Sequence, residues 1–185
     1  ARTDSYFNRT RQIVSRFGDC TVTYAFFIRR PVISAPAIML AWLKNVMAER
    51  QSPYSVDVLH PEGEWVGAGE PLVYVTGSFT HLADLETLLL QKLGSPCVAA
   101  HRAYQIALSL PRTRFLAMDA RHCAGYEMQE LMAYAASLGG RAAQRDGAIG
   151  LVGPANDAVA PLFGHTHRLG TMPHAVVRYC RPTVR

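Results

Sequence analysis

Residues 111–185 alternate short apolar runs with longer amphipathic runs, and this alternation constrains the fold more than any other feature of the chain. Short apolar runs are typical of buried strands, and runs with a 3.6-residue period are typical of helices. The predicted order is strand, helix, strand, helix, strand, over residues 113–119, 124–140, 147–153, 154–164 and 174–179. Strands and helices that alternate at short spacing form parallel sheets with crossover helices.

Three parallel strands are too few to close a barrel. We therefore expect either an open sheet or a barrel whose remaining strands lie on another chain or are missing. A glycine pair, Gly139–Gly140, marks the expected end of the longer helix in this part.

Residues 1–110 have a different sequence pattern, because their predicted strands alternate apolar and polar residues. Glycines punctuate the segment around 63–69, as in the tight turns of an antiparallel sheet. We predict helices at 4–18, 34–50, 78–94 and 96–110, and strands at 20–30, 54–60 and 71–77. The expected signals at the helix ends are N-caps at Asp4 and Ser34, a stop at Gly18, and Pro96 near a first turn.

These two sequence patterns divide the chain into two predicted domains of an α/β protein. Residues 1–110 form an α+β, sandwich-like domain with an antiparallel sheet. Residues 111–185 form the first β/α units of an irregular, incomplete β/α barrel.

The charged residues narrow the choice of partners. The net charge is +5, almost all of the basic residues are arginines, and no long basic run or aromatic stripe occurs. This distribution argues against a nucleic-acid partner. An arginine fork suits phosphate and carboxylate ligands, although an arginine-rich coding bias explains the composition equally well.

Hydropathy and cysteine spacing indicate in which cellular compartment the protein is expected. No apolar run reaches 18 residues, so we expect no membrane span. The four cysteines lie far apart with no CxxC pair, which is typical of reduced thiols in a cytoplasmic protein.

Ligands of α/β sheets gather at the carboxyl ends of parallel strands. This rule selects Asp119 and Arg121 after the first strand of the 111–185 part, and Asn156 after the second. Arg121 could hold an anion with a bidentate fork, or pair with Asp119 at the surface. Asp119 and Asn156 are equally well explained as helix caps.

Histidines near the carboxyl end form a second set of candidates. His174 stands at the start of the last predicted strand and could act as a nucleophile or proton carrier. Together with His165 and His167 it could also bind zinc, but the usual HExxH or paired-cysteine spacing is absent. We therefore assign no metal ligands.

Five segments, in order, resemble the N-terminal half of the nicotinate phosphoribosyltransferase family, which is related to nicotinamide phosphoribosyltransferase. TDSYFNRT resembles the opening TDxY segment of the family, and GEPLVYVTGSFTHLADLETLLL resembles its GEPL and LET stretch. AMDARHCAG is similar to the strand with a substrate-binding arginine, GPANDAVA to a GTSN-like turn, and GTMPHAVV to the GTxxH motif. The segments begin at residues 3, 69, 117, 153 and 170.

The resemblance implies a phosphoribosyltransferase of NAD biosynthesis and pyridine nucleotide salvage. Such an enzyme transfers phosphoribose from phosphoribosyl pyrophosphate to nicotinate, with Mg²⁺ and with ATP hydrolysis through a phosphorylated histidine. It also implies a cytoplasmic homodimer with active sites between subunits.

The resemblance also assigns roles to residues. His174 matches the phosphorylated histidine, and Tyr6 matches an aromatic group that stacks on the pyridine ring from the neighbouring subunit. Arg121 matches the substrate arginine, while Gly170 and Thr171 match backbone donors to the substrate carboxylate. Asn156 falls in the phosphate-site turn, where Pro154 removes one N–H.

Family members continue for about as many residues again, so the resemblance implies a half or fragment. We expect it to be inactive alone and to act with a C-terminal half. The alternative is a non-catalytic binding or interaction module derived from that fold.

Overall fold

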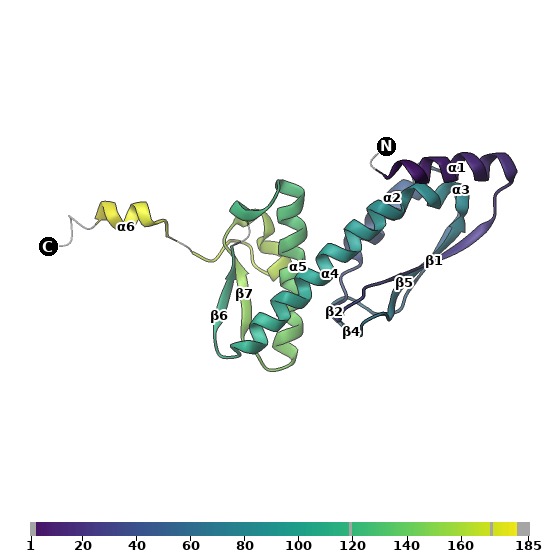
Figure 1. Cartoon of the computed structure of the whole chain (residues 1–185). Helices are drawn as coiled ribbons and strands as arrows, with labels where there is room; N and C mark the ends of the chain where they lie inside the picture. The colour runs from purple at the N-terminus through teal and green to yellow at the C-terminus, as the bar shows by residue number, and fades with distance from the viewer. Residues whose placement is uncertain (1–2, 119, 171, 181–185) are drawn as a thin grey trace.

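The computed structural model describes residues 3–118, 120–170 and 172–180, and Figure 1 shows their arrangement. Its elements, in chain order, are α1 (Ser5–Phe17), β1 (Thr21–Phe27), β2 (Val32–Ile33), α2 (Ala37–Glu49), β3 (Tyr54–Val58), β4 (Trp65–Val66), β5 (Pro71–Ser78), α3 (Phe79–Leu82), the 3₁₀ turn η1 (Ala83–Leu85), α4 (Glu86–Ser109), β6 (Arg114–Ala117), η2 (Ala120–His122), α5 (Tyr126–Arg145), β7 (Gly150–Pro154), η3 (Asp157–Phe163) and α6 (His174–Cys180).

The first sheet has three antiparallel strands in the order β1-β5-β3, as the alternating pattern predicts. Its inner side chains, including Phe26 and Val75, are buried. On the outer face Thr23 and Thr76 lie opposite each other, and their hydroxyls are 2.8 Å apart. A second antiparallel pair joins β2 to β4.

The predicted cap of α2 is wrong. Ser34 is buried, and its hydroxyl donates to the carbonyl of His60 at 2.7 Å. The helix begins at Ala37, whose N–H lies 3.2 Å from both the Glu62 carboxylate and the Tyr134 hydroxyl. Acceptors from distant segments thus replace the local cap. Ser34 instead holds the loop of residues 59–64, here called the 60s loop, through its hydrogen bond to His60.

The two helices predicted at 78–94 and 96–110 are not separate. The chain forms the short α3 and η1 first, and then one continuous helix, α4, with Pro96 inside it. An internal proline costs about 3 kcal/mol or more. Burial of Leu89, Leu93 and Cys97 along the same helix offsets that cost.

The helix α5 also continues beyond its predicted end at Gly139–Gly140, as far as Arg145. Both glycines are buried. A Cβ atom on Gly139 would overlap the backbone carbonyl of Ala100 in α4. The glycine pair therefore permits a close helix crossing and does not end the helix.

The predicted parallel arrangement is confirmed for β6 and β7, which pair in parallel with Ala117 opposite Pro154. α5 is the crossover between them. Within the described residues these two strands form an open pair and no closed barrel. The segment predicted as a third strand, 174–179, is instead part of α6. Its described side chains are exposed, so no sheet contact there favours an extended backbone.

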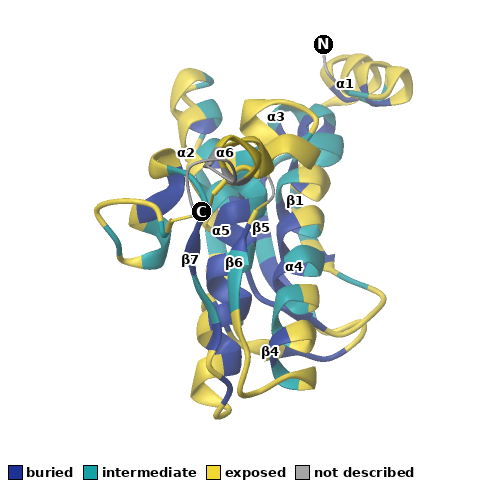
Figure 2. Ribbon diagram, turned by 90° about the vertical axis from the view of Figure 1, so that its left-hand side faces the viewer, coloured by how far each residue is buried: buried dark blue, intermediate teal, exposed yellow. Residues whose placement is uncertain are grey.

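The core lies around α4 and α5, which stand between the antiparallel sheet and the β6–β7 pair (Figure 1). Figure 2 shows the buried residues concentrated along these two helices and the strands, whereas α1 and α6 are mainly exposed. Tyr134 and Leu138 of α5 belong to the same buried cluster as Leu72 and Leu89. The predicted division at residue 110 remains a prediction.

Candidate functional site

The carboxyl ends of β6 and β7 lie side by side and form the best-built candidate site. Ala117 pairs with Pro154 at the last step of the parallel ladder. The N–H of Ala155 then donates to the carbonyl of Ala117 at 3.0 Å, which extends the contact beyond the strands. The loops after both strands therefore begin at one edge, as the sequence rule for parallel strands predicts.

After β6 the chain enters the short turn η2, which carries Arg121. The side chain of Arg121 is exposed at this edge. A guanidinium there presents its donors to solvent and to any anion that enters. Asp119, the other candidate after β6, lies outside the described residues.

After β7 the chain enters η3, and Asn156 caps it. The Asn156 side-chain oxygen accepts a hydrogen bond from the N–H of Val159 at 3.3 Å. The capping explanation of Asn156 is therefore confirmed, and this oxygen already has a partner. Its NH₂ group is the part that has donor capacity for a ligand.

The segment after η3 folds back over the end of β7. The N–H of Leu169 donates to the carbonyl of Pro154 at 3.0 Å, and His165 Nε2 lies 2.7 Å from the carbonyl oxygen of Val152. A Cβ atom on Gly153 would come within 2.7 Å of the Leu169 side chain. Gly153 thus permits the close approach of this segment to the strand.

An ion pair that the sequence analysis did not single out holds the fold-back in place. Asp157 accepts hydrogen bonds from the N–H of Arg168 at 2.8 Å and from its guanidinium at 2.5 Å. The backbone hydrogen bond from Arg168 holds the pKa of Asp157 below its usual value. The two residues lie 11 positions apart, beyond the spacing of neighbours within a helix or strand, so no periodic pattern in the sequence could have identified the pair.

The structure does not bring His174 beside this edge. Gly170 is exposed after the fold-back, and His174 is the exposed first residue of α6. Figure 1 shows α6 apart from the other elements. Thr171 lies outside the described residues. The roles assigned to these three residues remain predictions.

Tyr6 lies on α1, at the opposite end of the structure from α6 (Figure 1). Its side chain is 56% exposed, and its ring centroid lies 4.2 Å from that of Phe7. The prediction that Tyr6 serves the site of a neighbouring subunit remains untested.

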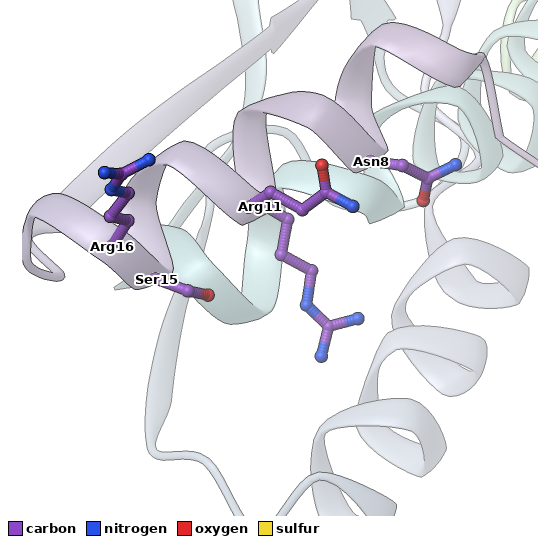
Figure 3. Close-up of a pocket in the computed structure, with 5 residues that line it drawn as sticks. Asn8, Arg11, Ser15 and Arg16 are labelled. Carbon is purple, nitrogen blue, oxygen red and sulfur yellow. The ribbon is translucent and has the colours of Figure 1, made fainter.

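A separate hollow follows the polar side of α1, and Figure 3 shows the side chains that line it. Arg11 and Arg16 make it basic, and Arg11 also lies 3.4 Å from the Asp84 carboxylate. It includes none of the predicted site residues. We therefore assign it no part in the candidate site.

Residues 3–118, 120–170 and 172–180 contain no metal-binding cluster and no membrane-spanning helix. No group of three or more His, Cys, Asp or Glu side chains is placed to hold a metal ion. His165, His167 and His174 in particular do not form such a cluster. No helix in these ranges is long and apolar enough to cross a bilayer.

The predicted α/β fold class is confirmed, and solved structures of other proteins share this fold. The chain is similar to the nicotinate-nucleotide pyrophosphorylase of Pyrococcus furiosus, with a TM-score of 0.73 and 22% identity over 96% of this chain. It is equally similar to human nicotinic acid phosphoribosyltransferase, with a TM-score of 0.73 and 21% identity over 97% of this chain.

A more distant likeness is to the nicotinate-nucleotide pyrophosphorylase of Ehrlichia chaffeensis, with a TM-score of 0.54 and 12% identity over 100% of this chain and 68% of that one. The chain spans only 43% of the Pyrococcus protein and 40% of the human one. No family model and no curated protein matches the sequence. At these identities the likeness establishes the fold alone.

Proposed function

We propose that the chain is part of a phosphoribosyltransferase of NAD biosynthesis, which transfers phosphoribose from phosphoribosyl pyrophosphate to nicotinate. One observation carries the proposal. Arg121 and Asn156 follow neighbouring parallel strands whose ends meet at Ala117 and Pro154, within a fold shared with nicotinic acid phosphoribosyltransferase. Such an edge is where α/β folds hold their ligands.

The substrate is proposed to lie between Arg121 and an aromatic ring. The exposed guanidinium of Arg121 can pair with the nicotinate carboxylate or lie over the pyridine ring. Tyr6 of a neighbouring copy would stack on the other face of the ring. Backbone N–H groups at Gly170 and Thr171 would donate to the same carboxylate.

In the transfer step the pyridine nitrogen forms a bond to ribose C1, and the bond from C1 to the pyrophosphate oxygen breaks. Positive charge develops on the ribose and negative charge on the departing pyrophosphate. Fixed donors stabilise such a charge because they need no reorientation. Mg²⁺ is part of the proposal through the resemblance alone, since the described residues include no group of three or more metal-ligating side chains.

ATP is the proposed second co-substrate, and His174 its phosphoryl acceptor. An imidazole nitrogen of His174 would take the γ-phosphoryl group, and ADP would leave. The exposure of His174 at the start of α6 leaves its ring accessible for this reaction. Phosphorylation would add nearly two negative charges near the end of the described chain.

The chain covers only 40% of the length of the human protein. We propose that it needs the rest of the enzyme, as a homodimer or as a complex with a C-terminal half, and that it acts in the cytoplasm. The second candidate is a non-catalytic module that binds nicotinate without turnover. The β6–β7 pair stays open within the described residues, and this open pair favours the second candidate.

The test uses the complete protein with nicotinate, phosphoribosyl pyrophosphate, Mg²⁺ and ATP. We expect nicotinate mononucleotide and pyrophosphate to form, and little product with nicotinamide or quinolinate. Nicotinate binding without product would favour the module, and a lack of response to all three pyridines would exclude the proposed substrate. Labelled ATP should give an acid-labile phosphohistidine that His174→Ala removes and His122→Ala retains.

A further inference from the structure

The parallel ladder between β6 and β7 contains a bulge just before the candidate site. Phe115 of β6 pairs with Leu151 of β7. The next residue of β6, Leu116, pairs with Gly153, so Val152 is the extra residue of β7 and has no partner in the ladder. A bulge bends its strand and re-aims the residues that follow, and bulges are common next to active sites. The direction in which β7 enters the candidate site therefore depends on this bulge.

His165 binds the carbonyl group of the bulge residue. Its Nε2 atom lies 2.7 Å from the carbonyl oxygen of Val152. A carbonyl oxygen only accepts hydrogen bonds, so Nε2 carries the hydrogen and donates it. The extra residue of a bulge is left out of the regular ladder, and a backbone group without a partner costs free energy when it is shielded from water. The half-buried ring of His165 thus stabilises the bulge.

The end of η3 directs His165 to this position. Gly164 ends η3 with a left-handed backbone, at a φ of 76°. Such a glycine turns the chain back after a helix. The N–H of His165 then donates to the carbonyl of Ala160 at 3.1 Å. Gly153 leaves room for the ring, because a Cβ atom there would come within 3.2 Å of His165 Cδ2.

The residues after the bulge lead directly to the candidate site. The N–H of Ala155 donates to the carbonyl of Ala117 in β6 at 3.0 Å, and Asn156 is the next residue. The Asn156 side-chain oxygen caps η3, which leaves its NH₂ group as the donor for a ligand. The direction of β7 after Val152 therefore decides where this NH₂ group lies.

We propose that His165 is a positioning residue of the site. It holds the bulge carbonyl of Val152 and thereby fixes the end of β7 and the place of the Asn156 amide. His165 contacts no reacting atom in this role. The catalytic consequence rests on the proposed phosphoribosyl transfer, whereas the effect on the strand end does not.

Two conservative variants isolate the hydrogen bond. In His165→Gln the amide nitrogen is as many bonds from Cβ as the histidine Nε2, so it can still donate to Val152. In His165→Asn the amide nitrogen ends one bond earlier, at the place of Nδ1, and falls short. Hydrogen exchange at the N–H of Ala155 gives a readout without substrate. We expect His165→Asn to speed this exchange at least ~5-fold, and His165→Gln to stay within about 2-fold of wild type.

His167→Asn is the matched control. It makes the same chemical change two residues later, on a side chain that is 84% exposed and whose Nδ1 lies 3.9 Å from the Asp157 carboxylate. It is expected to leave the exchange of Ala155 unchanged. Equal effects of His165→Asn and His165→Gln overturn the proposal, and so does an exchange rate that His165→Asn does not change.

Kinetics of the complete enzyme test the link to the Asn156 amide. Asn156→Asp keeps the oxygen that caps η3 and replaces the NH₂ donor. We expect His165→Asn to lower kcat/KM at least ~5-fold in the wild-type background, and to have little further effect in the Asn156→Asp background, because coupled residues are not additive. In an Arg121→Ala background the full loss should persist, since Arg121 follows the other strand.

The outcomes separate this proposal from the proposed function. Losses from His165→Asn that multiply with those from Asn156→Asp overturn the positioning role. A complete wild-type enzyme that transfers no phosphoribose refutes the proposed function instead. The exchange experiment then still decides whether His165 fixes the end of β7.

Discussion

Gly139 of α5 lies directly against the backbone carbonyl of Ala100 in α4, with no room for a side chain between them. The site depends on this contact, because α5 is the crossover that places β7 beside β6. Gly140, the next residue, lies against β7, where an added Cβ would come within 3.0 Å of the Leu151 Cβ. Closely packed glycines therefore position the strand ends that carry the candidate site.

Replacing Gly139 by alanine is expected to destabilise the fold by about 1–3 kcal/mol, because the new methyl group forces α4 and α5 apart. Urea unfolding of both proteins measures the change. Gly94→Ala in α4 is the control, because its added Cβ meets nothing within 4 Å. There the better helix propensity of alanine is expected to stabilise the protein by roughly 0.5–1 kcal/mol. Equal effects of the two substitutions would contradict the packing role of Gly139.

Asp84 is expected to give the fold an acid-sensitive contribution to stability. Burial alone would raise the pKa of Asp84, but the hydrogen bonds and charge of Arg50, helped by Arg11, outweigh it and hold the pKa below its usual value of 3.8. The Arg50 guanidinium contacts both carboxylate oxygens, at 2.7 and 3.0 Å.

A carboxyl group with a lowered pKa stabilises the fold above its unfolded pKa and loses that effect as the pH falls through its folded pKa. Asp84→Asn is therefore expected to cost about 1–3 kcal/mol at neutral pH. The difference from wild type should shrink below about pH 4. Asp57→Asn, at an exposed position of β3, serves as the control. A difference that is constant with pH would contradict the ion-pair explanation.

Tyr134 of α5 ties the start of α2 to the 60s loop. Its hydroxyl donates to the Glu62 carboxylate and accepts from the N–H of Ala37 at 3.2 Å. Burial, followed by the hydrogen bond to Glu62, raises the pKa of Tyr134 well above its usual value.

Tyr134→Phe is expected to lower the free energy of unfolding by about 1–2 kcal/mol, since it removes both hydrogen bonds of a buried hydroxyl group. Tyr104→Phe removes a hydroxyl bonded to the exposed Asp146, at 2.6 Å, and should cost less. Thermal unfolding of the pair gives the comparison. The reverse order of the two effects would refute this assignment.

Arg121 is expected to act on nicotinate binding in the complete enzyme. Arg121→Ala should raise the KM for nicotinate at least ~10-fold, because a charge-assisted pair contributes about 1.5–3 kcal/mol. Steady-state kinetics with each substrate varied in turn will show whether the effect is confined to nicotinate. Arg141→Ala is the control, because that guanidinium donates to the carbonyl of Leu162 at 2.9 Å. Equal losses in both variants would indicate a general effect on folding.

Strands and amphipathic helices of this chain could be predicted from residue periodicity. The antiparallel strand 71–77 and the parallel strands near 113–119 and 147–153 lie where the patterns place them. The position of Arg121 and Asn156 at one edge also followed from the strand order. These features depend on local sequence and on the geometry of parallel sheets, and both are visible in a single sequence.

Helix ends and long-range contacts could not be predicted in the same way. Pro96 and Gly139 are local signals for a helix end, yet both lie inside helices because α4 and α5 bury against each other. The run from His174 would suit a strand, but no neighbouring strand pairs with it among the described residues. A strand needs a partner, whereas a short helix satisfies its own backbone.

The sequence by itself determined the class of fold and the two strand ends that carry the candidate site, because periodicity and strand order are local properties. Three contacts were decided only by the tertiary structure. Asp157 pairs with Arg168, Ser34 donates a hydrogen bond to the 60s loop, and Gly139 packs against the backbone carbonyl of Ala100. Each of these contacts joins residues with no common pattern in the chain. Their energies depend on burial and close approach, which exist only once the helices and strands have packed.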